Sequence, residues 1–119
     1  MLNKIKVAEN FSLHEFQCHC GAVKLCPALV DKLQQLRNAL NRPIVITSGY
    51  RCEEHNRAVG GAQRSQHLLG RAADIRVAGL TPEEVAGVAE AVGFKGIGIY
   101  PTFTHVDVRE GPQARWKEE

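Results

Sequence analysis

Two histidines and one aspartate are the residues of this chain best suited to chemistry. His67 and Asp74 lie seven positions apart, with a glycine and two alanines between them, and His105 lies in the segment 103–107. Catalytic zinc sites take three protein ligands from His, Asp, Glu or Cys and leave one position open for water. The three side chains could therefore form a two-histidine, one-carboxylate zinc site. The alternative is two unconnected surface histidines and a solvated aspartate.

An open zinc site of this kind favours hydrolysis of an amide bond. Zinc lowers the pKa of bound water to about 7, which makes hydroxide available near neutral pH. A general base must also take the proton of the water and pass it to the leaving amine. Asp107 is the first candidate, because it lies two residues after His105 and about 7 Å along the same face of an expected strand. At that distance it could also orient a zinc ligand. Glu53 and Glu54 are further candidates.

Two more polar residues complete the candidate site. Arg51 follows an expected strand, and its rigid guanidinium fork suits a substrate carboxylate. The alternative for Arg51 is an ordinary surface arginine. Tyr100 could donate a hydrogen bond to the oxyanion that develops during hydrolysis. Serine catalysis is disfavoured, because no serine stands in a GxSxG motif.

Helical signals flank these residues along the chain. Apolar residues recur at helical spacing over residues 27–41, after a proline suited to a first turn. Thr81, Pro82 and Glu84 form a strong helix start, and the pattern runs to about Val92 before Gly93. A second capping box predicts a short helix or turn over residues 12–16, and residues 53–59 are expected to form another short helix.

Four strands are expected to present the polar residues. Residues 43–48 are β-branched and predict a buried strand, and residues 72–77 alternate so that Asp74 lies on a polar face. Residues 96–100 and 103–109 predict two strands joined by a tight turn at 101–102. In the last strand His105 and Asp107 share one face. The tail after residue 110 is polar except for Trp116, which could fold back on the body.

Composition limits the class of protein. At 119 residues and 13.1 kDa, we expect one domain over residues 1–119 and a monomer. A net charge of +2 without a basic tract argues against nucleic-acid binding. No apolar stretch approaches the roughly 20 residues of a membrane helix. The first six residues lack the apolar segment of a signal peptide, so we expect synthesis in the cytoplasm.

Four cysteines form a second group of potential ligands. Cys18, Cys20, Cys26 and Cys52 could hold a structural zinc ion, with His19 as a substitute ligand. Their spacing is not that of paired CxxC motifs. Free thiols, or one disulfide in an oxidising setting, are the alternatives.

Several ordered motifs together resemble the zinc D-Ala-D-Ala carboxypeptidase and L,D-endopeptidase family of bacterial cell-wall peptidases. The resemblance is to its compact, VanY-like single-domain branch, covers roughly residues 10–110, and extends distantly to the Hedgehog amino-terminal fold. The motifs are Ser48-Gly49-Tyr50-Arg51 with Asn56, Gly60-Gly61-Ala62, Ser65-x-His67-x-x-Gly70-x-Ala72-x-Asp74, Gly96-x-Gly98-x-Tyr100 and the segment 103–109.

The resemblance implies both a fold and a site. It implies an α+β fold with a small antiparallel sheet and helices packed mainly on one face. It also implies His67, Asp74 and His105 as zinc ligands, with Arg51 near the carboxylate of a peptidoglycan stem peptide. The expected activity is D,D-carboxypeptidase or L,D-endopeptidase. Without a signal peptide, the chain would reach the wall after release or export, as a phage-type lysin or tail component does.

One position departs from the family pattern. Many relatives carry Asp or Glu three residues before the last zinc histidine, where it acts as the catalytic base, and here that residue is Thr102. Asp107 could take the role instead. The alternative function is a non-catalytic, zinc-containing module that binds the cell wall.

Overall fold

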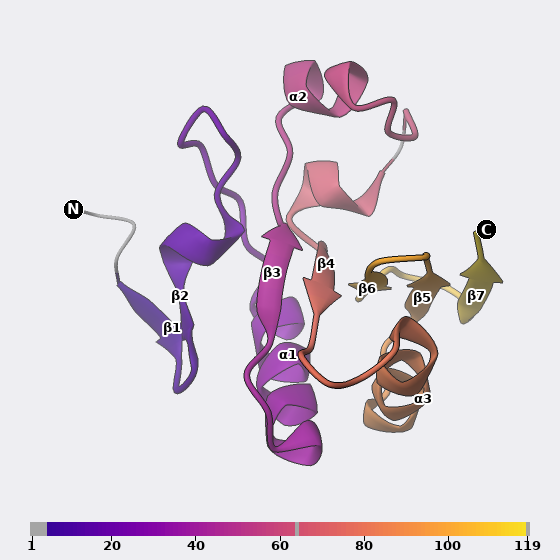
Figure 1. Ribbon diagram of the computed structural model, residues 1–119. Helices are drawn as coiled ribbons and strands as arrows, with labels where there is room; N and C mark the ends of the chain where they lie inside the picture. Colours follow the sequence, from indigo (N-terminus) through magenta and orange to yellow (C-terminus); the bar gives the residue numbers. More distant parts are fainter. Residues whose placement is uncertain (1–4, 64, 119) are drawn as a thin grey trace.

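The computed structural model describes residues 5–63 and 65–118, which fold into two sheets, three α-helices and two short 3-10 helices (Figure 1). The elements in chain order are β1 (Lys6–Ala8), β2 (Phe11–Ser12), η2 (Leu13–Phe16), α1 (Pro27–Leu40), β3 (Val45–Ser48), α2 (Glu53–Ala58), η3 (Gln66–Leu69), β4 (Ala72–Arg76), α3 (Pro82–Val92), β5 (Gly96–Ile99), β6 (Thr104–Asp107) and β7 (Ala114–Lys117).

The main sheet has the strand order β3-β4-β6-β5-β7. Its first four strands are antiparallel, and β7 adds to the edge of β5 in parallel. The register places Asp74 of β4 directly opposite His105 of β6, and His105 opposite Gly98 of β5. Residues that face each other across strands project to the same side, so this register gathers the polar side chains on one face.

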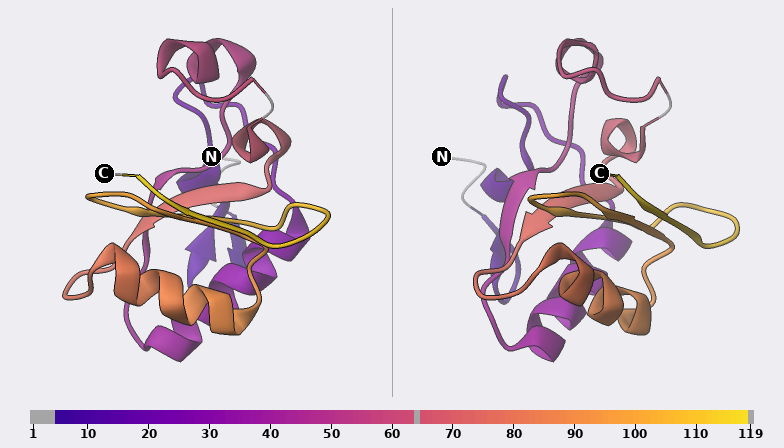
Figure 2. Two further views of the ribbon diagram at one scale, coloured as in Figure 1. Left: turned by 90° about the vertical axis from the view of Figure 1, so that its right-hand side faces the viewer. Right: turned by 45° about the vertical axis from the view of Figure 1, so that its right-hand side comes forward.

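The two faces of the sheet have different partners. Helices α1 and α3 cover one face, whereas α2 and η3 lie on the opposite side (Figure 2). The helix-covered face carries the hydrophobic core, to which Ile75, Ile97 and Val106 contribute from the central strands. The α+β fold with its main helices on one face is thus confirmed, and the other face is left to the polar residues.

The expected helices and caps are present. Helix α1 ends at Asn41, whose left-handed φ of 52° closes the helix, and α3 has the expected capping box between Thr81 and Glu84. The box between Ser12 and Glu15 leads into η2. No helix in the described part of the chain is long and apolar enough to span a membrane.

One strand prediction needs correction, and one strand was not expected. Strand β3 is an edge strand and not a buried one: within the described residues it pairs with β4 alone, and Val45 is 58% exposed. No strand was expected in the tail, but residues 114–117 form β7, and Trp116 folds back on the body as the sequence suggested. Strand β7 makes the sheet mixed, and it places Trp116 beside Gly98.

Candidate metal centre

Three elements bring the predicted ligands together. Asp74 and His105 face each other across β4 and β6, and His67 lies on η3, which immediately precedes β4. One potential ligand atom from each residue lies within 4.8 Å of the others, and all three side chains are buried. The chain thus assembles the His67–Asp74–His105 group that the sequence predicts.

The orientation of His67 is fixed by the backbone. Ser65 caps η3 by accepting a hydrogen bond from the His67 backbone N–H. Nδ1 of the ring lies 2.7 Å from the carbonyl oxygen of Gly49. A carbonyl can only accept, so Nδ1 carries the proton and donates it. In the neutral ring, the lone pair is therefore on Nε2, 3.2 Å from Oδ1 of Asp74.

His105 has the opposite tautomer to His67. Its Nε2 lies 2.7 Å from Oδ2 of Asp107, which as a carboxylate can only accept, so Nε2 donates. In the neutral ring, the lone pair is on Nδ1, 3.0 Å from the same oxygen of Asp74. A carboxylate behind a histidine is the usual device that fixes the tautomer of a metal ligand.

Three electron-rich atoms therefore converge on one point. With neutral histidines, two lone pairs and Oδ1 of Asp74 repel one another unless a cation lies among them. Ligand atoms bound tetrahedrally to zinc at about 2.0–2.1 Å are about 3.3 Å apart. The observed separations of 3.0 and 3.2 Å are close to that spacing. The chemistry of this donor set fits a zinc ion.

Protonation is the other way to relieve this repulsion. Burial by itself lowers the pKa of His105, but hydrogen bonds to Asp107 and Asp74 outweigh it and raise the pKa. Burial by itself raises the pKa of Asp74, but hydrogen bonds from His105 and His67 hold that pKa far below its usual range. Protons and zinc therefore compete for the same lone pairs.

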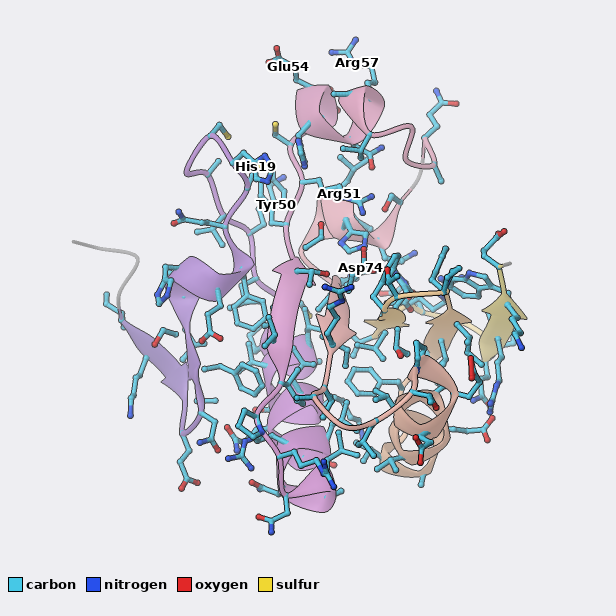
Figure 3. The ribbon with its side chains drawn as sticks, viewed as in Figure 1. His19, Tyr50, Arg51, Glu54, Arg57 and Asp74 are labelled. Carbon is cyan, nitrogen blue, oxygen red and sulfur yellow. The ribbon has the colours of Figure 1, made fainter. Side chains whose placement is uncertain are left out.

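Arg51 contacts the other oxygen of Asp74. Its Nη2 lies 3.2 Å from Oδ2 of Asp74, while Nε donates to Ser48 and Nη1 donates to Asn56. Buried Asn56 is itself held by the carbonyl of Ala62. Figure 3 shows Arg51 lying between α2 and Asp74. Arg51 is thus directed to the centre, and it is not an ordinary surface arginine.

Asp107 is fully enclosed by its partners. Its Oδ1 accepts from the backbone N–H and Nε of Arg109, and its Oδ2 accepts from Nη2 of Arg109 and from His105. Burial by itself raises its pKa, but the Arg109 and His105 hydrogen bonds hold that pKa far below its usual range. The carboxylate lies behind the His105 ring, on the side away from Asp74.

Two glycines make room for this arrangement. A Cβ on Gly96 would collide with the Asp107 carboxylate, and a Cβ on Gly98 would lie 2.6 Å from the Trp116 ring. Trp116 is a site residue whose role the sequence did not reveal. Its Nε1 donates to the Tyr100 hydroxyl at 3.1 Å, and its ring lies 5.3 Å from that of His105. The pattern Gly96-x-Gly98 was the sequence feature that could have indicated large side chains packed against this strand.

A cleft of about 450 Å³ opens above the three ligands, within the size range of ligand pockets. Arg51, Tyr100, Phe103 and Trp116 line it, and Asp74 is the only acidic residue among the described lining residues. Gln66 also lines it, and its buried Oε1 has no hydrogen-bond partner within the described chain.

The other candidate bases lie elsewhere. Glu53 and Glu54 are exposed and do not line the cleft, and Figure 3 shows Glu54 on the far side of α2 from Asp74. Thr102 faces a separate apolar hollow, and its carbonyl accepts from Arg76. The turn at residues 101–102 therefore leaves Tyr100 and Phe103, but not Thr102, in the lining of the cleft.

The cysteines divide into a group of three and one apart. Cys18, Cys20 and Cys52 have their sulfur atoms within 4.8 Å of one another, whereas Cys26 caps α1 and is not in the group. The predicted set of four is wrong for Cys26. Burial raises the pKa of the Cys18 thiol, but backbone N–H groups of Cys52 and Cys20 outweigh it and lower the pKa to about 7.

Comparison with known proteins gives relatives over most of the chain. This chain is 33% identical over 102 residues to the probable peptidoglycan L,D-endopeptidase MepK of Haemophilus influenzae. The matched region covers 79% of this chain and 55% of the relative. The chain is 31% identical over 97 residues to MepK of Escherichia coli strain K12, covering 76% and 53%. The chain thus spans about half the length of these relatives.

A shorter match and a family model agree with this result. The zinc D-Ala-D-Ala carboxypeptidase of Streptomyces albus G is 44% identical over 45 residues, covering 37% of this chain and 18% of the relative. The family model for Peptidase M15 matches residues 8–108. The resemblance inferred from the motifs is confirmed, and the chain belongs to the Peptidase M15 family.

Proposed function

We propose that this chain is a zinc-dependent peptidase that hydrolyses an amide bond in the stem peptides of peptidoglycan. The observation that carries the proposal is the convergence of the His67, Asp74 and His105 ligand atoms at the base of a cleft. The names of the relatives supply the substrate class, since two of them are peptidoglycan L,D-endopeptidases. When bound, zinc would act as a Lewis acid and lower the pKa of water to about 7.

Three residues of the cleft lining are suited to binding the peptide or stabilising the oxyanion. Arg51 reaches the centre from one side and has N–H groups suited to a carboxylate or carbonyl oxygen of the peptide. The Tyr100 hydroxyl accepts from Trp116, so its own proton can be donated to a developing oxyanion. Gln66 also lines the cleft, and its buried, unpartnered Oε1 would have to turn outward to accept a hydrogen bond from a peptide N–H.

Asp107 has a positioning role in this proposal. Both of its oxygens are occupied by Arg109 and His105, and its side chain is completely buried. Such a carboxylate fixes the His105 ring and strengthens it as a ligand. It is a poor general base, because its pKa is far below neutrality and no free lone pair faces the cleft.

L,D-endopeptidase activity is the first expectation, because the relatives that match over three quarters of the chain carry that name. D,D-carboxypeptidase activity is the second, supported by the short match to a zinc D-Ala-D-Ala carboxypeptidase and by the Arg51 cation at the centre. The chain is expected to act as a monomeric single domain at the cell wall, after release or export.

A non-catalytic wall-binding module is the competing candidate. It is favoured by Thr102 at the position of the usual base and by the lack of a second acidic residue in the described cleft lining. Incubation of purified peptidoglycan with zinc-loaded and with chelator-treated protein, followed by mass spectrometry, separates the two. Chelator-sensitive release of peptides supports the peptidase, and binding to the wall without release supports the module.

A further inference from the structure

The group of Cys18, Cys20 and Cys52 lies apart from the cleft. Cys18 and Cys20 are on the loop after η2, and Cys52 caps α2 in the segment that joins it to β3. None of the three lines the cleft above Asp74. We propose that Cys18, Cys20 and Cys52 hold a second, structural zinc ion, with His55 as the fourth ligand.

Sulfur spacing is the first support. Two thiolates bound to zinc at about 2.3 Å in a tetrahedron have their sulfur atoms about 3.8 Å apart. The Sγ atoms of Cys18 and Cys52 are 3.6 Å apart. A disulfide would need about 2.05 Å, so the pair is not a cystine; its spacing is that of an S–H···S contact and also that of two corners of a zinc tetrahedron.

Local backbone structure is the second support. The loop turns sharply between Cys18 and Gly21, whose N–H donates to the Cys18 carbonyl at 2.8 Å. This turn directs Cys18 and Cys20 to the same place as Cys52. The His55 N–H donates to the Cys52 sulfur at 3.4 Å, and such N–H···S contacts suit a thiolate.

A histidine is available for the fourth position. His55 follows Cys52 by three residues, on the first turn of α2, and is only partly exposed. Its ring packs against that of His19 at a tilt of 48°, with 4.3 Å between centroids. Both histidines line one hollow with Cys18 and Tyr50, and Figure 3 shows His19 on the loop next to the segment that carries Tyr50 and Arg51. Neither ring belongs to the group of close ligand atoms, so a histidine must turn to bind the ion, and His55 is favoured because its backbone N–H already contacts the Cys52 sulfur.

The proposed ion would stabilise the segment that supports the catalytic centre. This segment contains Gly49, whose carbonyl orients His67, and Arg51, which contacts Asp74. Four protein ligands close a zinc site and give it a structural role, in contrast to a catalytic site with an open position. The cysteine site should therefore contribute to stability and not directly to hydrolysis.

Zinc content of protein purified under reducing conditions gives the test. We expect two zinc ions per wild-type chain, one in His67→Ala, one in Cys20→Ser and none in the double variant. Cys26→Ser is the matched control and should retain two. Cobalt-loaded His67→Ala should show thiolate-to-cobalt charge-transfer absorption, which does not depend on hydrolytic activity.

A second measurement starts with the wild-type chain, so that its main result does not depend on the folding of a variant. Cys20 is exposed without metal, and it should become resistant to alkylation when zinc is added. His55→Ala should weaken that protection, whereas His19→Ala should not. One zinc per wild-type chain, or unchanged alkylation of Cys20, would overturn the proposal. Recovery of a Cys18–Cys52 disulfide without zinc would overturn it as well.

Discussion

The two groups of potential zinc ligands are built on different kinds of structure. Asp74 and His105 are on the central strands of the sheet, where the pairing register fixes which residues face each other. The cysteines come from a loop and from the end of a short connection. Strand pairing fixes the first group of ligands, whereas a zinc ion in the second group would tie together two segments that no strand pairing joins. Removal of metal should therefore disable the first site and destabilise the second.

The largest effect should come from removing a strand-borne ligand. His105→Ala leaves Asp74 and His67 without their third partner, so the zinc is lost and peptide release should fall below detection. Release of peptides from peptidoglycan measures this. His14→Ala, which removes an exposed histidine outside the cleft, is the control and should keep wild-type activity.

Asp107→Asn tests how the sheet site is supported. The amide cannot replace the carboxylate in all its bonds to His105 and Arg109. Loss of such a supporting group typically costs about 10–100-fold in metal affinity or activity. Competition with a zinc chelator measures the affinity. If the zinc affinity stayed at the wild-type value while hydrolysis was lost, Asp107 would be the base and its positioning role would be wrong.

Gly96→Ala tests the close packing of β5 against the Asp107 carboxylate. The new Cβ would collide with the Asp107 carboxylate, so strand or side chain must shift. Overpacking of this kind costs about 1–3 kcal/mol of stability, measured by urea unfolding. Gly87→Ala is the control: its Cβ meets nothing within 4 Å on α3, and Ala should stabilise the helix by about 0.5–1 kcal/mol. Equal stabilities of the two variants would contradict the packing.

A pH dependence should separate the metal-free from the zinc-loaded sheet site. The pKa of His105 in the metal-free fold is above its ordinary value of 6.5. Stability from this group is complete below that value and is lost as pH rises through the folded pKa. Zinc binds the unprotonated rings, so its stabilisation should grow over the same range. Urea unfolding from about pH 6 to about pH 8 tests both trends. Metal-free stability that rises with pH would refute this assignment.

The smallest effect should come from the outermost strand. Trp116→Phe keeps the packing of a ring against Gly98 but removes the hydrogen bond to the Tyr100 hydroxyl. The net loss should be about 0.5–1.5 kcal/mol of stability. If Tyr100 acts on the peptide, kcat should change while the zinc content stays constant. An altered zinc content would instead place Trp116 among the residues that hold the metal site.

The local elements of this fold were largely predictable from the sequence. Helical spacing, the Thr81 capping box and the alternation around Asp74 each act within a few residues, so α1, α3 and β4 were expected at nearly their observed bounds. The ligand set was predictable for a different reason. Asp74 and His105 each lie on the polar face of a strand, and pairing of those strands unites them.

Long-range pairing explains what the sequence did not reveal. Strand β7 has only four residues with no distinctive pattern, so its parallel pairing with β5 depends on the tertiary structure. The edge position of β3 is likewise a property of the whole sheet. Asp107 was expected about 7 Å along the strand from His105. Its carboxylate reaches the ring and can orient it, as that spacing suggested, with Oδ2 2.7 Å from Nε2 of His105.

The most direct test of the central claim compares peptide release from purified peptidoglycan by the zinc-loaded chain, the chelator-treated chain and His105→Ala, analysed by mass spectrometry. The zinc-loaded chain should release peptides cut at one kind of amide bond, and the other two should release none. Re-addition of zinc should restore activity to the chelated chain only. Equal release by all three, or no release by a chain with its His67–Asp74–His105 centre loaded, would contradict the claim that this centre is catalytic.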